Sequence, residues 1–207
     1  YYSYSQLAGR ISSIQHAVLA HPATLHRIGI VLSDTADTYA AIVAILLLGK
    51  TYVPLHPGHP AERVQQIIAQ AELEVVLSSS ASPYFGNVTC IDLSSLATEG
   101  NSPILSEGDY SNTYAYILFT SGSTGIPKGT PITYGNVDSF ATGFYHIGYQ
   151  LTAQDRCLQM FDLTFDLSVV SYLMPLCAGA CVYTLPDKGM KFTNVYSVLE
   201  EHNITFA

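Results

Sequence analysis

One loop of the sequence concentrates the small polar side chains that bind phosphate groups. The segment ILFTSGSTGIPKGT, residues 117–130, places hydroxyl side chains, glycines and one lysine directly behind a short apolar run. Glycines let backbone N–H groups approach an anion closely, and hydroxyl and ammonium groups add donors and charge. A polyphosphate site is therefore one hypothesis for this loop. Its candidate members are Thr120, Ser121, Gly122, Ser123, Thr124, Gly125 and Lys128.

The loop differs from the common P-loop in the position of its lysine. In the P-loop pattern G-x-x-x-x-G-K-[ST], the lysine follows a glycine at the start of a helix. Lys128 instead follows Pro127, and the proline pushes Ile126 toward an extended backbone. We therefore predict that the chain does not run straight from this loop into a helix that carries the lysine. A solvent-exposed Ser/Gly turn between a strand and a helix is the alternative interpretation, and neither interpretation by itself names a reaction.

The composition allows a buried core and argues against nucleic acid as a partner. The chain has 207 residues, of which 48% are hydrophobic and 12% are charged. This length fits one large domain or two lobes of about a hundred residues each. Lysine and arginine together number 8 against 16 aspartates and glutamates, and no basic run occurs. A nucleic-acid-binding surface would need such a basic patch.

The sequence predicts neither a cysteine metal site nor a membrane span. Cys90, Cys157, Cys177 and Cys181 form no CxxC pair and have no histidine cluster nearby. We interpret them as core thiols in a reducing compartment. The apolar run AAIVAILLLG, residues 40–49, is far shorter than a membrane span and predicts a buried helix. No signal peptide is visible, so the expected location is the cytoplasm.

Apolar strand patterns alternate with helical patterns along the chain. This alternation predicts α/β architecture, with two doubly wound, mostly parallel α/β lobes. The polar segment 97–112 is the expected boundary, which gives a first lobe at 1–108 and a second at 109–207 that carries the loop. Residues 204–207 resemble a strand, and we expect the sequence to be a piece of a longer protein. The other strands are expected at 27–32, 51–55, 74–79, 88–93, 114–120, 156–161 and 180–185, and helices at 1–20, 38–48, 61–71, 136–148, 167–179 and 194–203.

Four segments resemble the adenylate-forming (AMP-binding) enzymes. LFTSGSTGIPKGT resembles their phosphate loop, commonly written YTSGSTGxPKGV, with Phe119 in place of the frequent tyrosine and Thr130 in place of valine. Residues 46–79, LLLGKTYVPLHPGHPAERVQQIIAQAELEVVLSS, are similar to a segment of amino-acid adenylation domains, and YSYSQL near the start is similar to LTYxEL. Residues 164–180 resemble the FDxSV segment. The chain thus resembles the adenylation domains of nonribosomal peptide synthetases and D-alanine ligases along nearly its whole length.

The resemblance implies a reaction with ATP. In this family a carboxylate attacks the α-phosphate of ATP, which gives an acyl-adenylate and pyrophosphate, and the acyl group then passes to a thiol. The loop residues would hold the β- and γ-phosphates, with Lys128 as the catalytic cation, and Mg²⁺ would screen these phosphates. For an amino-acid-activating member, the thiol belongs to phosphopantetheine on a carrier protein. Adenylation itself needs no protein base, because a carboxylate is already ionised at neutral pH.

Other family segments are absent from these 207 residues. Nothing similar to GYGPTE, with its magnesium-binding glutamate, or to YRTGD, with its ribose-binding aspartate, occurs in the sequence. The barrel and the small C-terminal lobe with its lysine are missing too, so the sequence corresponds to the two α/β lobes of the large N-terminal region. We expect the main magnesium ligand to lie downstream and these residues alone to be inactive.

The stretch FDLS, residues 165–168, bears on which carboxylic acid is activated. In amino-acid-activating relatives the aspartate of FDxS pairs with the α-ammonium group, which the resemblance assigns to Asp166. Leu167 and Val170 match positions that line the side-chain pocket, and their apolar character disfavours a charged substrate side chain. By residue type alone, Asp166 could merely cap a helix that begins at Leu167.

Three functions are therefore compared. The leading hypothesis is part of an amino-acid adenylation domain, whose partners are the amino acid, a carrier protein and the rest of the same chain, with no nucleic acid and no membrane. The second is an acyl- or aryl-CoA synthetase, in which Asp166 is only a helix cap. The third is a non-catalytic nucleotide-binding domain on the same scaffold.

Overall fold

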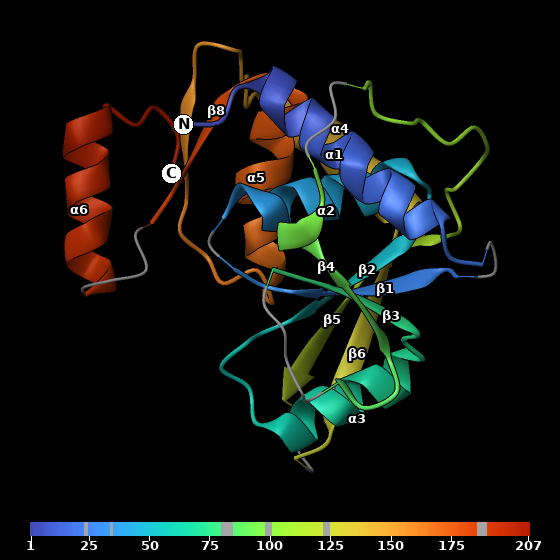
Figure 1. Cartoon of the computed structure of the whole chain (residues 1–207). Coiled ribbons are helices and arrows are strands. Elements are labelled where there is room, and N and C mark those ends of the chain that lie inside the picture. The colour runs from blue at the N-terminus through green and yellow to red at the C-terminus, as the bar shows by residue number, and fades with distance from the viewer. Residues whose placement is uncertain (23–24, 34, 80–84, 98–100, 122–124, 186–189) are drawn as a thin grey trace. The chain divides into compact units, whose positions relative to one another are not determined.

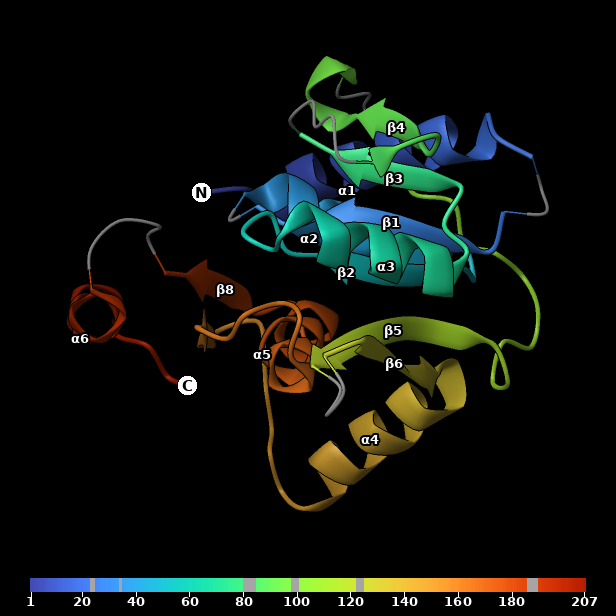
Figure 2. The same cartoon turned by 90° about the horizontal axis from the view of Figure 1, so that it is seen from below.

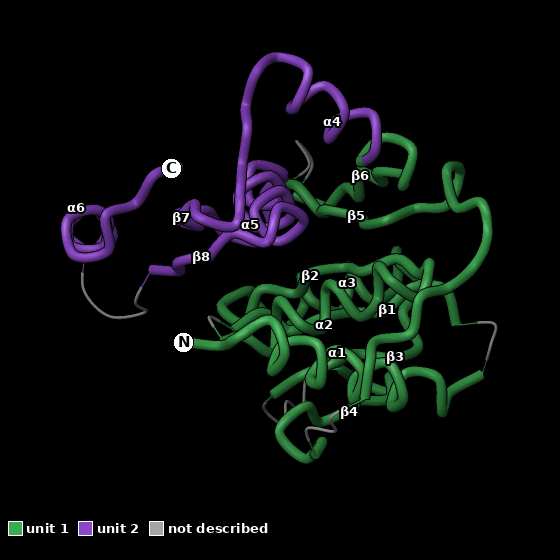
Figure 3. The backbone as a smooth tube through the Cα atoms, turned by 90° about the horizontal axis from the view of Figure 1, so that it is seen from above, with its two compact units in different colours: residues 1–137 green, residues 138–207 purple. Residues whose placement is uncertain are grey.

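A six-stranded sheet forms in the first part of the chain, as seen in a computed structural model that describes all residues except 23–24, 34, 80–84, 98–100, 122–124 and 186–189. Contacts divide the chain into unit 1, Tyr1–Val137, and unit 2, Asp138–Ala207, which Figure 3 colours separately. Each unit has its own strands and helices, and each is described separately below.

The sheet of unit 1 is mostly parallel and has helices on both faces. Its strand order is β4-β3-β1-β2-β5-β6, and every neighbouring pair is parallel except β5 with β6. Figure 1 shows α1 and α2 over one face and α3 over the other, and Figure 2 views the sheet from the α3 side. This arrangement confirms the predicted α/β fold class. The elements are α1 (Tyr4–Leu19), β1 (Arg27–Val31), α2 (Ala36–Leu47), β2 (Thr51–Leu55), α3 (Ala61–Ala71), β3 (Val75–Ser78), β4 (Thr89–Asp92), the 3-10 helix η2 (Leu93–Ser95), β5 (Tyr114–Ser121) and β6 (Pro127–Thr133).

Helix α3 packs on the sheet through one apolar stripe. Val64, Ile67 and Ile68 follow one another at helical spacing and are all buried. They contact an apolar cluster that includes Ile117 and Phe119 of β5. The burial of this stripe, at about 25 cal/mol per Å² of apolar surface, holds α3 against the strands that carry the predicted phosphate loop.

The polar connector between β4 and β5 is part of unit 1. The buried side chain of Gln15 donates to the Ile104 carbonyl at 2.8 Å and accepts from the Ile104 N–H at 2.7 Å. The Thr51 hydroxyl donates to the Tyr114 carbonyl at 2.7 Å, at the start of β5. Because β5 then pairs with β2, the boundary between unit 1 and unit 2 falls after Val137. The lobe boundary predicted from the sequence lies between residues 108 and 109.

Gly49 follows α2 in a conformation and a space that favour glycine. Its φ is +67°, and an added Cβ would lie 2.3 Å from Cε1 of the Tyr110 ring. We expect Gly49→Ala to lower the free energy of unfolding by about 1–3 kcal/mol, because it adds backbone strain and a steric clash. Urea denaturation followed by circular dichroism would measure this loss. The matched Gly143→Ala variant, whose added Cβ meets nothing within 4 Å, should not be destabilised; equal losses would contradict the steric explanation.

Strand β6 was not predicted from the sequence. Pro127 and Pro131 both lie in it, and proline is excluded from central strands because it lacks an N–H donor. β6 is the last strand in the sheet order and pairs only with β5 among the described strands. On its other side, the backbone of β6 needs no N–H donors for hydrogen bonds to a neighbouring strand. The edge position explains why a sequence with two prolines forms a strand here.

Unit 2 contains a two-stranded parallel sheet and its helices. β7 pairs with β8, and the strand predicted at 204–207 is reduced to a single bridge between Cys157 and Phe206. Phe144 stacks on Tyr149, with ring centroids 4.8 Å apart, and meets Phe206 edge to face. The elements are β7 (Arg156–Gln159), α5 (Asp166–Cys177), β8 (Cys181–Thr184) and α6 (Lys191–His202); α4 (Tyr134–His146) begins in unit 1 and ends in unit 2.

The cysteines do not all lie in the core. All four are free thiols, but Cys90 and Cys177 are exposed, which corrects the prediction of core thiols for these two. Cys157 is buried, and burial raises the pKa of its thiol to about 11. Among the residues that the structure describes, no helix combines the length and apolarity needed to cross a membrane.

Candidate functional site

The β5–β6 hairpin carries the described part of the predicted phosphate loop. Lys128 lies directly across the hairpin from Thr120, and the Thr120 hydroxyl donates to the Lys128 carbonyl at 3.5 Å. Thr120, Ser121 and Lys128 are exposed. At 3.5 Å the bond from Thr120 is long, so its hydroxyl can turn to an anion; the end of the hairpin then presents two hydroxyl groups and one ammonium group as donors.

The turn of the hairpin uses a glycine-specific conformation. Gly125 has a φ of +81°, a region that glycine enters without steric cost. The predicted site residues Gly122, Ser123 and Thr124 lie outside the described residues. Lys128 belongs to β6, so the prediction that the chain does not enter a helix carrying the lysine is confirmed.

Asp166 is the first residue of α5. The N-cap residue is Phe165, which has extended backbone angles and makes no side-chain cap bond. The helix therefore begins at Asp166, one residue before the predicted start at Leu167, and Asp166 is not its N-cap residue. The Oδ1 atom of Asp166 accepts the N–H of Leu167 at 2.9 Å, which satisfies one of the backbone donors that a helix start leaves unpaired. The negative charge in the first turn also complements the helix dipole. The carboxylate is exposed and can meet a cation from solvent.

Two apolar residues share the start of α5 with Asp166. Leu167 is 56% exposed and Val170 is half-buried. Residues three and four apart are neighbours on a helix surface, so Val170 lies beside both Asp166 and Leu167. The structure thus brings the three predicted substrate residues together within the first two turns of α5.

Sequence reasoning missed the residues that shape this turn. The Oδ1 atom of Asp162 accepts both the N–H and the hydroxyl of Thr164 at 2.8 Å, just before the helix. The Ser168 hydroxyl donates to the Phe165 carbonyl at 2.6 Å, and the Ser171 hydroxyl donates to the Leu167 carbonyl at 3.1 Å. The D-x-T spacing before the helix is the signal that would have indicated this turn.

The phosphate-loop residues belong to unit 1, and the residues on α5 belong to unit 2. Within the described parts of the chain, no group of three or more His, Cys, Asp or Glu side chains could hold a metal ion. Mg²⁺ commonly binds one or two carboxylates together with substrate phosphates.

The sequence matches the AMP-binding enzyme family over residues 1–207, and the chain belongs to this family. This result confirms the resemblance to adenylate-forming enzymes. Pyochelin synthetase PchF of Pseudomonas aeruginosa is 32% identical over 99% of this chain and 11% of its own length. A linear gramicidin synthase of Brevibacillus parabrevis is 31% identical over 98% of this chain and 3% of its own length. The chain thus spans a small part of the curated relatives that it matches.

Solved structures of nonribosomal peptide synthetases share the fold. FmoA3, bound to alpha-methyl-L-serine-AMP, superposes with a TM-score of 0.85 at 23% identity, over 99% of this chain and 23% of that one. The four-domain synthetase AB3403, bound to AMP and glycine, has a TM-score of 0.79 at 28% identity, over 96% of this chain and 15% of that one. The first of these similarities shows the fold alone.

Proposed function

We propose that residues 1–207 are part of an amino-acid adenylation domain that activates an amino acid with ATP. The observation that carries this proposal is the similarity, along 96% of the chain, to a synthetase whose structure holds AMP and glycine. In the proposed reaction, a carboxylate oxygen of the amino acid bonds to the α-phosphorus of ATP. The bond from that phosphorus to the bridging oxygen breaks, and pyrophosphate leaves with the electron pair.

The phosphate loop is proposed to hold the pyrophosphate as it leaves. Thr120 and Ser121 offer hydroxyl donors, and Lys128 adds a positive charge across the hairpin from Thr120. Donors fixed before the reaction stabilise charge as it develops, without reorganisation. Mg²⁺, when bound to the phosphates, would neutralise part of their charge.

The start of α5 is proposed to bind the amino acid. Asp166 would pair with the α-ammonium group, and the partly exposed apolar side chains of Leu167 and Val170 favour an uncharged substrate side chain. Acids that lack the amino group would leave the Asp166 carboxylate unpaired. This contrast separates an amino-acid adenylation domain from a general acyl-CoA synthetase.

The second step is proposed to be transfer of the aminoacyl group to a phosphopantetheine thiol of a carrier protein. The structure of PA1221, which contains adenylation and PCP domains, superposes with a TM-score of 0.81 at 20% identity. The cysteines are free thiols, which fits a reducing compartment such as the cytoplasm.

Amino-acid-dependent exchange of pyrophosphate into ATP tests the proposal. In the full-length chain, Lys128→Ala should lower exchange by about 10²–10³-fold for every amino acid that is activated, because the lysine contacts phosphate and not the acid. Lys191→Ala, which removes another exposed lysine, should leave exchange unchanged. A loss in Lys128→Ala that depends on the amino acid would contradict the phosphate assignment.

A further inference from the structure

A large ring lies over a glycine next to the phosphate-binding residues. Phe119 and Gly129 are opposite each other in the β5–β6 hairpin, one position before the Thr120–Lys128 pair. Phe119 is 8% exposed and belongs to the apolar cluster beneath α3. Successive side chains on a strand point to opposite faces. Phe119 therefore points toward the α3 side, and Thr120 and Lys128 point away from it.

The ring fills the space that a side chain at position 129 would need. A Cβ added to Gly129 would lie 2.9 Å from Cζ of Phe119 and 3.0 Å from Cγ2 of Ile117. Real Cβ atoms almost never approach a heavy atom so closely, so any other residue here would displace the ring. Glycine at position 129 thus allows the Phe119 ring to pack closely across the hairpin.

The packing of Phe119 on Gly129 is important for the register of β6, because β6 is an edge strand. Among the described strands β6 pairs only with β5, so the cross-strand contacts of this hairpin set its register. A slip by one residue turns every side chain of a strand to the other face. A slip of β6 would turn Lys128 toward the apolar cluster and bring the buried Pro127 out to solvent. An aromatic ring packed over an edge glycine pins the register against such a slip.

We propose that Phe119 and Gly129 are positioning residues for Lys128. Their packing on the α3 side fixes the register of β6, and the register places Lys128 across from Thr120, with both side chains on the opposite face. The use of this geometry to hold ATP phosphates rests on the proposed function. The register itself follows from the packing of the ring and the glycine, and it can be tested separately.

The Gly129→Ala variant of the full-length chain tests both parts. We expect the peptide covering 127–133 to exchange its amide hydrogens with deuterium faster than in the wild type, because the displaced ring no longer pins β6. In pyrophosphate exchange, we expect kcat/KM for ATP to fall about tenfold, because the misplaced Lys128 no longer stabilises the charge of the leaving pyrophosphate, while the KM for the amino acid changes less than twofold. Gly143→Ala adds a methyl group where nothing lies within 4 Å and should change neither measurement.

A second substitution shows whether the ring is the cause. Phe119→Leu removes the Cζ atom that the added methyl group of Gly129→Ala would strike, so the double variant should recover most of the deuterium protection and of kcat/KM for ATP. Failure of this rescue would overturn the proposal, and so would an unchanged kcat/KM for ATP in Gly129→Ala. If Gly129→Ala does not fold, Phe119→Leu alone is the test. It should speed deuterium exchange in 127–133 and lower kcat/KM for ATP, and no change in either would overturn the proposal. A wild type that catalyses no exchange would contradict the proposed function, while the deuterium measurement would still decide the register.

Discussion

Replacement of Asp166 by alanine is expected to lower activation of the cognate amino acid by at least about a hundredfold and to spare its des-amino analogue. Asp166 is exposed within residues 1–207, and in the proposed site of the full-length chain the bound amino acid would cover it; two opposite charges about 4 Å apart at such a partly dry site attract by roughly 4 kcal/mol. Removal of one partner from such a pair costs about 3–5 kcal/mol, because the other charge is left without a counterion. At about 1.4 kcal/mol per tenfold change, this loss exceeds two orders of magnitude. Pyrophosphate exchange with both acids, in wild type and variant, gives the comparison.

The matched control for this experiment is Asp138→Ala, which removes an exposed aspartate from α4. It should leave both substrates unaffected. The des-amino analogue should react no worse with Asp166→Ala than with the wild type, since no unpaired carboxylate then faces it. Equal losses for both acids in Asp166→Ala would contradict the amino-acid assignment and favour a general acyl-CoA synthetase. In that case Asp166 would act only on the helix dipole, an effect of about 0.3–1 kcal/mol on stability.

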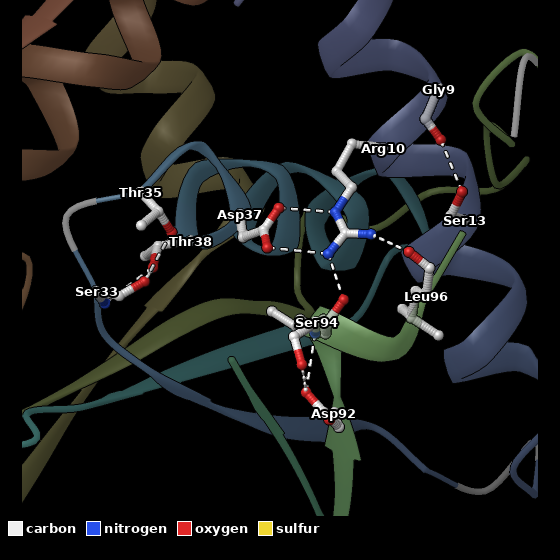
Figure 4. Close-up of polar contacts among 11 residues, drawn as sticks. Gly9, Arg10, Ser13, Ser33, Thr35, Asp37, Thr38, Asp92, Ser94 and Leu96 are labelled. Carbon is white, nitrogen blue, oxygen red and sulfur yellow. Dashed lines mark hydrogen bonds and ion pairs between the residues drawn. The ribbon is translucent and has the colours of Figure 1, made fainter. Parts of the chain in front are cut away.

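Loss of the Asp37 carboxylate is expected to destabilise unit 1 by about 3–5 kcal/mol. Figure 4 shows the Arg10 guanidinium between Asp37 and the Leu96 carbonyl. Nε and Nη2 of Arg10 donate to the two carboxylate oxygens at 2.7 and 2.9 Å, and Nη1 donates to the Leu96 carbonyl at 2.8 Å. Nη2 also donates to the Leu93 carbonyl. These bonds join α1, α2 and η2, and the Arg10 side chain is 7% exposed, so Asp37→Ala strands a buried charge.

Urea unfolding of the full-length chain would measure this effect, with Glu72→Ala as the matched control. Glu72 pairs with Arg27 at 2.8 Å, but its side chain is 77% exposed, and such surface pairs contribute about 0–1 kcal/mol. The double variant Arg10→Met/Asp37→Leu should recover much of the lost stability, because it leaves no unpaired charge. Similar losses in Asp37→Ala and Glu72→Ala would show that burial of the ion pair is not the cause.

Elements with a strong local pattern could be predicted from the sequence. The bounds of α3 were predicted at 61–71 and are observed there, because its apolar residues have helical spacing and Pro60 precedes it. Strand β2 was likewise predicted at 51–55, where all five residues are buried. Strand β6 could not be predicted, because its prolines argue against a strand unless its edge position is known.

The site was predicted less completely. The resemblance selected Lys128 and Asp166 as candidate site residues, but it could not show that Lys128 lies in a strand opposite Thr120. That arrangement depends on antiparallel pairing, which the local pattern around the prolines hides. The division after Val137 was not predicted either, because it depends on the pairing of β5 with β2, which are far apart in the sequence. The polar composition of 97–112 is typical of a linker, and sequence alone does not show that Gln15 binds Ile104 there.

The pairing of β5 with β2 determines where this chain can be joined to another member of the AMP-binding enzyme family. By its polar composition, the segment 101–112 is one candidate position for a crossover between two parent proteins. A crossover there would give β2 a foreign neighbour in the sheet, and it would break the Thr51–Tyr114 bond unless both parents share it. A crossover after Val137 lies inside α4, so it must preserve the helical phase, but it keeps the whole six-stranded sheet from one parent. Chimeras joined after Val137 should therefore fold more often than chimeras joined within residues 101–112.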